Sequence, residues 1–251
     1  MISKIRKDNK GLVTIPIGQI NVPLKIIFEK RNTVRVALGK DKAILRAPFY
    51  TKSSLHEHIK MAHEWLLKID AEQPDLIARF NFKYYDEENQ ILILGRDAYT
   101  VKMEEVETET GSIKLVGDTL SLEIPKNLNE HTKRNMVRDL LSKILIKRYK
   151  NVVAERIKLW NQHFFHKEIK GISLKYNTSN WGSCSASNRL NISSRCLLLP
   201  LDVFDYIIVH ELSHLIEMNH SKAFWEVVKA VMPNYEEKEE WLKKNGSQLE
   251  F

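Results

Sequence analysis

The chain has 251 residues and a mass of 29.4 kDa, enough to bury a sizeable core as one large domain or two small ones. Hydrophobic residues make up 43%, charged residues 28%, and the formal net charge is +7. No apolar stretch approaches the length that spans a bilayer, and the N-terminus lacks a signal-peptide core, so we expect no membrane segment. Cys184 and Cys196 are too few for a disulfide framework, which predicts free thiols and a cytoplasmic location.

The first half of the chain predicts β-structure with one helix. Short β-rich runs are broken by Gly, Asn and Pro, and hairpin signals occur at 86–89 and 116–119. A helix capped by Ser53 or Ser54 is expected to run to about Asp70. We therefore expect residues 1–126 to form a β-rich N-terminal region. The expected strands are 12–17, 22–29, 33–38, 42–47, 80–85, 90–94, 98–103, 112–116 and 119–124.

The second half of the chain is predicted to be mainly helical. A long helical pattern covers residues 129–166, strands are expected at 172–176 and 190–192, and residues 202–209 are apolar on nearly every side. Residues 202–209 are therefore predicted to form a buried helix with Asp202 as its N-cap. Cations on the long helix are expected to line a solvated face. They are Lys133, Arg134, Arg138, Lys143, Lys147, Arg148 and Lys150.

The most specific signal is the run from His210 to His214, with sequence HELSH. Residues four apart share a helix face, so the two histidines can bind one metal ion together. Glu211 then stands beside the metal, where a carboxylate can take a proton from water. Zinc prefers imidazole ligands and lowers the pKa of its water to about 7. We predict one catalytic zinc ion per chain with Glu211 as base. The alternative is a core helix whose histidines bond to neighbouring groups.

His220, six residues after His214, is the expected third ligand. Asn219 tolerates a left-handed conformation and is expected to reverse the chain there, and Ser221 is expected to cap the next helix. The rival ligands are carboxylates further along. They are Glu226, together with Glu236 and Glu237, which are expected in the first turn of a helix capped by Asn234, where acids are favourable without a metal.

Three segments, Trp181–Ser185, Asp205–His214 and Asn219–Trp225, resemble the YgjP-type metallopeptidase-like family, which is related to SprT-like and WLM zinc proteins. The resemblance implies an α+β fold, in which the β-rich N-terminal region precedes a minimal zincin-like helical core with a short antiparallel sheet over residues 127–251. It also implies that the three histidines hold zinc and that Glu211 is the general base. In zincin folds a strand edge beside the metal helix holds an extended substrate.

The leading functional hypothesis is a zinc-dependent metallopeptidase that acts on a peptide or protein. Its transition state needs a hydrogen-bond donor besides zinc. The candidate donors are Tyr206, Arg189, Arg195 and Tyr235.

Two alternatives remain open. A metal-dependent nucleoside triphosphate pyrophosphatase would need cations near the metal, and a nucleic-acid-associated module or DNA-linked protease would use the basic helix. A Glu in the position of a base argues against a purely structural metal site. The cations available for a nucleotide are Arg189, Arg195, Lys222 and Lys229.

Overall fold

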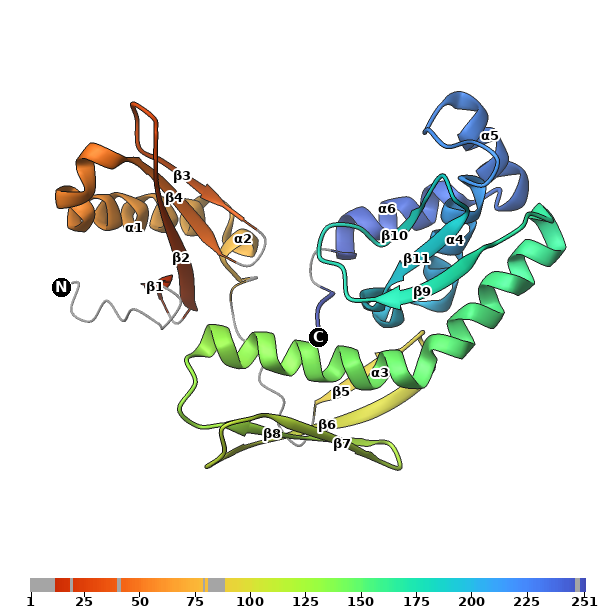
Figure 1. Ribbon diagram of the computed structural model, residues 1–251, viewed down its shortest axis with the longest axis horizontal. Helices are drawn as coiled ribbons and strands as arrows, with labels where there is room; N and C mark the ends of the chain where they lie inside the picture. The colour runs from red at the N-terminus through yellow and green to blue at the C-terminus, as the bar shows by residue number, and fades with distance from the viewer. Residues whose placement is uncertain (1–11, 19, 40–41, 79, 81–88, 247–248) are drawn as a thin grey trace. The chain divides into compact units, whose positions relative to one another are not determined.

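The computed structural model describes residues 12–18, 20–39, 42–78, 80, 89–246 and 249–251. It has the expected α+β fold, with three small sheets and several helices (Figure 1). The residues group into two compact units, one of 1–83 with 127–134 and one of 84–126 with 135–251. The expected boundary at 126 therefore divides the chain differently, since residues 84–126 group with the C-terminal helices. The strand expected at 80–85 and the hairpin signal at 86–89 lie almost wholly outside the described residues.

In the first unit, a four-stranded sheet packs its apolar face against α1. Alternate residues point to that face, among them Val13, Leu24 and Leu45, which are fully buried with Leu66 of the helix. The strand order is β1-β2-β4-β3, and only the central pair β2–β4 is parallel. The elements are β1 (Leu12–Ile17), β2 (Ile20–Glu29), β3 (Arg35–Leu38), β4 (Ala43–Pro48), η1 (Phe49–Ser54), α1 (Leu55–Glu72) and α2 (Pro74–Ala78).

The second sheet repeats the architecture of the first. Its order β5-β6-β8-β7 has the same pattern of pairing, with β6–β8 parallel and the outer pairs antiparallel. Both first hairpins turn through a glycine with positive φ, Gly18 at 57° and Gly95 at 69°. Each sheet is then followed by a long helix, so the chain contains an internal structural repeat. The elements are β5 (Gln90–Ile93), β6 (Asp97–Val106), β7 (Ser112–Val116), β8 (Thr119–Pro125) and α3 (Glu130–Trp160).

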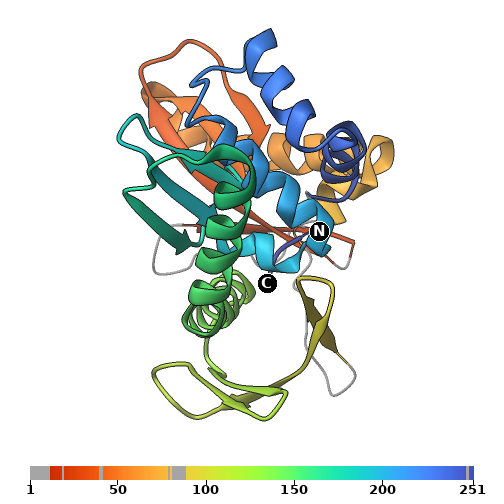
Figure 2. The same cartoon turned by 90° about the vertical axis from the view of Figure 1, so that its right-hand side faces the viewer.

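Helix α3 runs along one face of the second sheet (Figures 1 and 2). Val137, Leu141 and Leu145 recur every four residues and are all buried, as expected for the covered side of a helix. The hydroxyl of Tyr149 lies 3.0 Å from that of Tyr99 on β6. The π-helix η2 (Asn161–Phe165) follows α3 and ends at His166, which has a left-handed conformation. Among the described residues, no helix is both long and apolar enough to cross a membrane.

The third sheet is mixed, so the expectation of an antiparallel sheet was wrong. Its order is β10-β11-β9, in which β10–β11 is antiparallel and β11–β9 is parallel. The hairpin β10–β11 places β11 in the middle of the sheet, where its direction matches that of β9, and leaves β10 at the edge. The strands are β9 (Gly171–Lys175), β10 (Gly182–Cys184) and β11 (Arg189–Ser193), and η3 (Ser194–Leu198) follows them.

The remaining helices are α4 (Leu201–Ser213), α5 (Lys222–Val231) and α6 (Tyr235–Asn245). Helix α4 starts two residues earlier than expected, because Pro200 occupies the N-cap position that we predicted for Asp202. Asp202 lies in the first turn, where its carboxylate binds Lys238 of α6 at 2.6 Å. Side chains on nearly every side of α4 are buried, which confirms the predicted buried helix.

Candidate metal centre

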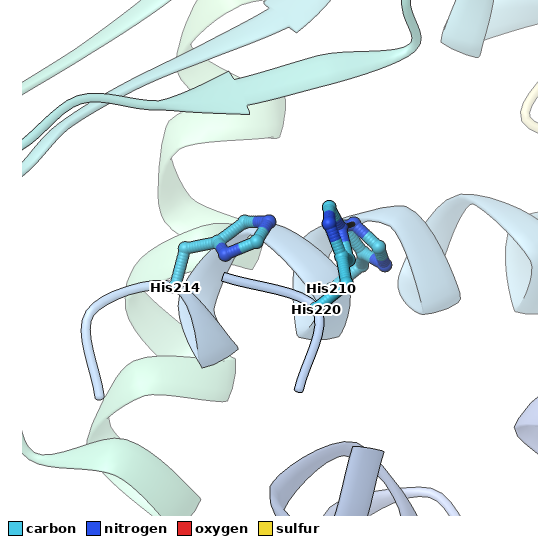
Figure 3. A group of neighbouring side chains, drawn as sticks. All are labelled: His210, His214 and His220. Atoms are coloured by element: carbon cyan, nitrogen blue, oxygen red, sulfur yellow. Dashed lines mark hydrogen bonds between the residues drawn. The ribbon is translucent and has the colours of Figure 1, made fainter. Parts of the chain in front are cut away.

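Three histidines meet at the C-terminal end of α4 (Figure 3). His210 and His214 project from the same face of this helix, and His220 reaches them from the turn before α5. One candidate donor atom from each ring lies within 4.8 Å of the others. The ε2 nitrogens of His210 and His220 are only 3.0 Å apart. The chain thus gathers three imidazole nitrogen donors within eleven residues.

The turn that carries His220 forms differently from our expectation. Asn219 does not have the positive φ that we predicted. Its side-chain oxygen instead accepts a hydrogen bond from the backbone N–H of Ser221 at 3.0 Å, which forms an Asx turn. The expectation for Ser221 is confirmed, because its hydroxyl accepts from the N–H of Phe224 at the start of α5. Two local side-chain bonds therefore set the position of His220.

The donor geometry fits a small four-coordinate metal such as zinc. Nitrogens that each lie about 2.0–2.1 Å from a tetrahedral zinc ion are about 3.3 Å from one another. The observed 3.0 Å between two of the donors and the 4.8 Å limit for the set bracket that spacing. Three protein ligands also leave one position open, which is the arrangement of catalytic rather than structural sites.

A backbone carbonyl fixes the tautomer of His214. Its δ1 nitrogen lies 3.0 Å from the carbonyl oxygen of Glu217. A carbonyl only accepts, so the δ1 nitrogen carries the proton and the ε2 nitrogen keeps its lone pair. Such a hydrogen bond behind a metal ligand orients the ring and raises its basicity.

Burial keeps two of the imidazoles neutral. Burial, together with the neighbouring rings of His214 and His220, lowers the pKa of His210 from 6.5 to about 3. Burial also lowers the pKa of His214, and His220 adds to this effect. Because only the neutral ring binds a metal ion, both residues are in their binding form at neutral pH.

The carboxylate of Glu211 lies beneath the edge strand β10. The residue is only 5% exposed, and its Oε2 atom has no hydrogen-bond partner among the described residues. A Cβ at Gly182 would come within 2.6 Å of Oε1 and 2.7 Å of two carbon atoms of this side chain. Because Gly182 has no side chain, the side chain of Glu211 can occupy this space. Burial raises the pKa of Glu211 from 4.5 to about 8.

The histidines and Glu211 line an open cleft with a volume of about 580 Å³. Helix α4 forms its floor, β10 and α6 form walls, and the loop that ends at His220 closes a further side. Most of the other lining groups are apolar, and one ion pair, Lys243 with Glu239 at 3.1 Å, lies among them. The other lining residues are Asn180, Trp181, Gly182, Ser183, Cys184, Tyr206, Ile207, Met218 and Leu242.

Of the four predicted oxyanion or substrate contacts, Tyr206 alone is among the residues that line this cleft. Its ring meets that of His210 edge-on, with centroids 6.0 Å apart. The ring of Tyr235 stacks on that of Tyr206, with centroids 6.4 Å apart, and Tyr235 is not among the residues that line the cleft. Arg189 lies over Gly171 of β9, again away from the cleft.

Arg195 has a structural environment. It is 4% exposed, and its guanidinium donates to the carbonyl oxygens of Gly246 and Leu249, each at 3.0 Å, and of Thr178 at 3.3 Å. It also lies 4.2 Å from the ring centroid of Trp181. Its guanidinium thus holds the C-terminal segment and the loop before β10 in place.

The rival ligands and the predicted nucleotide contacts also lie outside the cleft lining. Glu226 forms an exposed pair with Lys222 at 3.7 Å, and Glu236 and Glu237 occupy the first turn of α6 as expected. Lys229 is exposed on α5.

Sequence reasoning did not identify two features of the site, namely Gly182 and the α6 wall of Glu239, Leu242 and Lys243. The i, i+3, i+4 spacing of the last three residues was a signal that they share one helix face. Nothing in the sequence indicated which neighbour that face meets. The two cysteines are free, as predicted, and Cys184 lines the cleft. Burial, together with Glu211, raises the pKa of the Cys184 thiol to about 11.

The sequence matches a known protein family. The model of the YgjP-like metallopeptidase domain matches residues 31–245, which is most of the chain. The chain belongs to the YgjP-like metallopeptidase family. As a YgjP-like protein it is a metallohydrolase of the peptidase type, and the family implies a bound metal.

A solved metallopeptidase structure is similar to a smaller part of this YgjP-like chain. The crystal structure of the metallopeptidase zymogen of Pyrococcus abyssi abylysin is similar to part of it, with 20% sequence identity and a TM-score of 0.33. The similarity covers 37% of this chain and 93% of that chain. No curated protein matches the sequence.

Proposed function

We propose that this YgjP-like protein is a zinc-dependent peptidase in which His210, His214 and His220 hold the metal and Glu211 is the general base. One observation carries the proposal: three imidazole donors within 4.8 Å of one another stand beside a buried carboxylate that has an oxygen without a partner. Zinc supplies Lewis acidity when bound, so that a carbonyl is polarised and water becomes more acidic.

Glu211 moves the proton in this proposal. Its carboxylate takes a proton from the attacking water and returns it to the amine that leaves when the C–N bond breaks. Burial makes this carboxylate a stronger base than an exposed one, since it raises the pKa to about 8. Gly182 contributes by leaving the space in which the carboxylate lies.

The edge strand β10 offers a place for an extended peptide. Ser193 donates its N–H to the carbonyl of Trp181, and Ser185 donates to the carbonyl of Arg189, so the odd-numbered residues of this strand face β11. In an antiparallel pair the residues between them point their N–H and C=O groups away. Gly182 and Cys184 therefore present backbone groups on the open side of the sheet, where another strand can pair.

The charges in the cleft favour a peptide over a nucleotide. Three or four phosphate charges need several cations, yet Lys243 is the one lysine or arginine in the described lining and is already paired with Glu239. The cations predicted for a nucleotide lie elsewhere. Nucleic-acid binding by the exposed basic residues of α3 stays a prediction that depends on charge alone.

Metal analysis is the first experiment. We expect about one zinc ion per purified chain, and none in the double variant of His210→Ala and His214→Ala, because two of the three donors are then lost. Full occupancy in that variant would place the metal at other residues and remove the proposal.

Replacement of the base is the second experiment. Glu211→Gln should retain zinc but lose peptide hydrolysis by at least about a hundredfold, since an amide cannot accept the proton. Glu226→Gln is the matched control, because it makes the same change at an exposed residue of α5. If Glu211→Gln turns over a confirmed peptide substrate at the wild-type rate, another group is the base.

A further inference from the structure

Peptide hydrolysis needs a hydrogen-bond donor for the charge that develops on the carbonyl oxygen. Arg195 cannot serve, because its guanidinium is buried and bonded to three backbone carbonyls. Arg189 and Tyr235 lie outside the cleft lining. Tyr206 remains, four residues before His210 and on the same face of α4.

The hydroxyl of Tyr206 is an unused donor. The residue is 4% exposed and lines the cleft, yet its hydroxyl has no hydrogen-bond partner among the described residues. The hydroxyl is not sealed from solvent, and the cleft is the open space that this residue lines. Buried tyrosines normally bond through this group. This hydroxyl is therefore free to donate to water or to a ligand in the cleft.

The ring of Tyr206 is held firmly enough to aim that hydroxyl. Tyr235 stacks on it with an interplanar angle of 18°, and Trp225 stacks on Tyr235 at 5.3 Å with the same angle. His210 meets the ring edge-on. A donor fixed before the reaction stabilises developing charge without reorganisation, which is the source of its catalytic value.

We propose that the hydroxyl of Tyr206 donates a hydrogen bond to the carbonyl oxygen of the scissile peptide as that oxygen becomes negative. This assignment rests on the proposed function. The oxygen of water bonds to the carbonyl carbon, the C–N bond breaks, and Glu211 carries the proton to the amine. Tyr206 keeps its own proton throughout, so it is a hydrogen-bond donor and transfers nothing.

The test compares two tyrosines that differ in their access to the cleft. Tyr206→Phe should lower kcat by about 10²–10³, the usual effect of losing one such donor, while KM changes less than about twofold. Tyr235→Phe removes the same group from the adjacent ring of the stack and should leave kcat unchanged. Zinc content and melting temperature should match the wild type in both variants, because each retains its ring.

A phosphinic peptide gives a second measurement that needs no turnover, since its tetrahedral phosphinate stands in for the oxyanion. Tyr206→Phe should weaken its binding by about the same factor as kcat/KM, and Tyr235→Phe should not. Three results would overturn the assignment: unchanged kcat and phosphinate affinity in Tyr206→Phe, a rise in KM alone, or equal losses in both variants. Wild-type turnover by Glu211→Gln would instead refute the role of Glu211 in the proposed function, and the phosphinate measurement would still decide the role of Tyr206.

Discussion

At the scale of single residues, the site depends on the close contact between Gly182 in the edge strand and Glu211 in α4. Gly182 has no side chain, and the carboxylate of Glu211 fills the space where a Cβ would stand. Backbone above and helix below leave this carboxylate few alternative positions. The smallest substitution in the edge strand therefore acts directly on the candidate base.

Gly182→Ala should displace Glu211 and lower peptide turnover by at least about tenfold, since misplacement by about 1 Å has large effects on rate. Zinc affinity should remain close to that of the wild type, because Glu211 is not one of the three donors. The control is Gly171→Ala, whose new methyl group would meet the flexible end of Arg189 at 2.8 Å. Steady-state kinetics and a zinc competition titration measure both effects. Equal turnover in the two alanine variants would show that the carboxylate tolerates the methyl group.

His220→Ala tests the third ligand. Loss of a residue that hydrogen-bonds to a metal ligand typically reduces metal affinity by about ten- to hundredfold. Loss of one of the three ligands themselves should reduce zinc affinity by more than this. Glu226→Ala should leave the affinity nearly unchanged, because this residue forms an exposed pair with Lys222. Competition with a chelator gives both values. An unchanged affinity in His220→Ala, with a collapse in Glu226→Ala, would reassign the site to two histidines and one glutamate.

At the scale of elements, α4 is fixed from two sides. The guanidinium of Arg156 on α3 forms a two-pronged ion pair with Asp205 at 2.5 Å, and the indole of Trp160 donates to the same carboxylate at 3.0 Å. Lys238 of α6 binds Asp202 at the start of α4. The helix that carries two candidate ligands is thus anchored by side chains that do not themselves enter the cleft.

The cap of α5 couples local stability to the metal site. Ser221→Ala should lower the free energy of unfolding by about 1 kcal/mol, since the hydroxyl bonded to the N–H of Phe224 is lost. It should also weaken zinc binding, because the neighbouring residue is His220. Asn234→Ala at the start of α6 is the control, since Asn234 makes no such side-chain bond. Denaturant unfolding measures the stability of both variants, and a zinc competition titration measures their zinc affinity. Similar losses in the two variants would mean that the Ser221 cap has no special value.

At the scale of the whole molecule, local patterns were predictable and distant contacts were not. The 3.6-residue period of a helix placed His210 beside His214, and the capping preference of serine identified Ser221. The parallel pairing of β9 with β11 depends on which strands meet after folding, and the contact of Gly182 with Glu211 joins residues 29 positions apart. Local propensity carries no information on such contacts, so the mixed sheet, the α6 wall and the internal repeat appeared only in the structure.

The pH dependence of stability in the metal-free protein follows from two buried groups. Glu211 has its pKa raised from 4.5 to about 8, so the folded protein keeps a proton that the unfolded chain loses, and stability falls as the pH rises through this window. His210 has its pKa lowered from 6.5 to about 3, so stability also falls as the pH drops from 6.5 to 3.

Burial lowers the pKa of His214 as well, so the two histidines outweigh Glu211 below about pH 6.5, and the chelated protein should be most stable near that pH. Glu211→Gln removes the carboxyl group, and we expect the decline above about pH 6.5 to flatten in that variant. Thermal melts of chelator-treated protein across this range provide the measurement. Parallel curves for the wild type and Glu211→Gln would contradict the assigned shift.

All three candidate donors lie within residues 210–220, and this short separation limits how much a metal ion can stabilise the fold. A ligand stabilises a protein only to the extent that it prefers the folded chain to the unfolded one. Histidines this close in sequence remain neighbours after unfolding, so the unfolded chain retains part of its affinity for zinc. The rise in melting temperature on adding zinc should therefore be smaller than the folded protein's own dissociation constant would give. A metal ion bound by these histidines would therefore contribute more to the proposed chemistry of the cleft than to the stability of the fold.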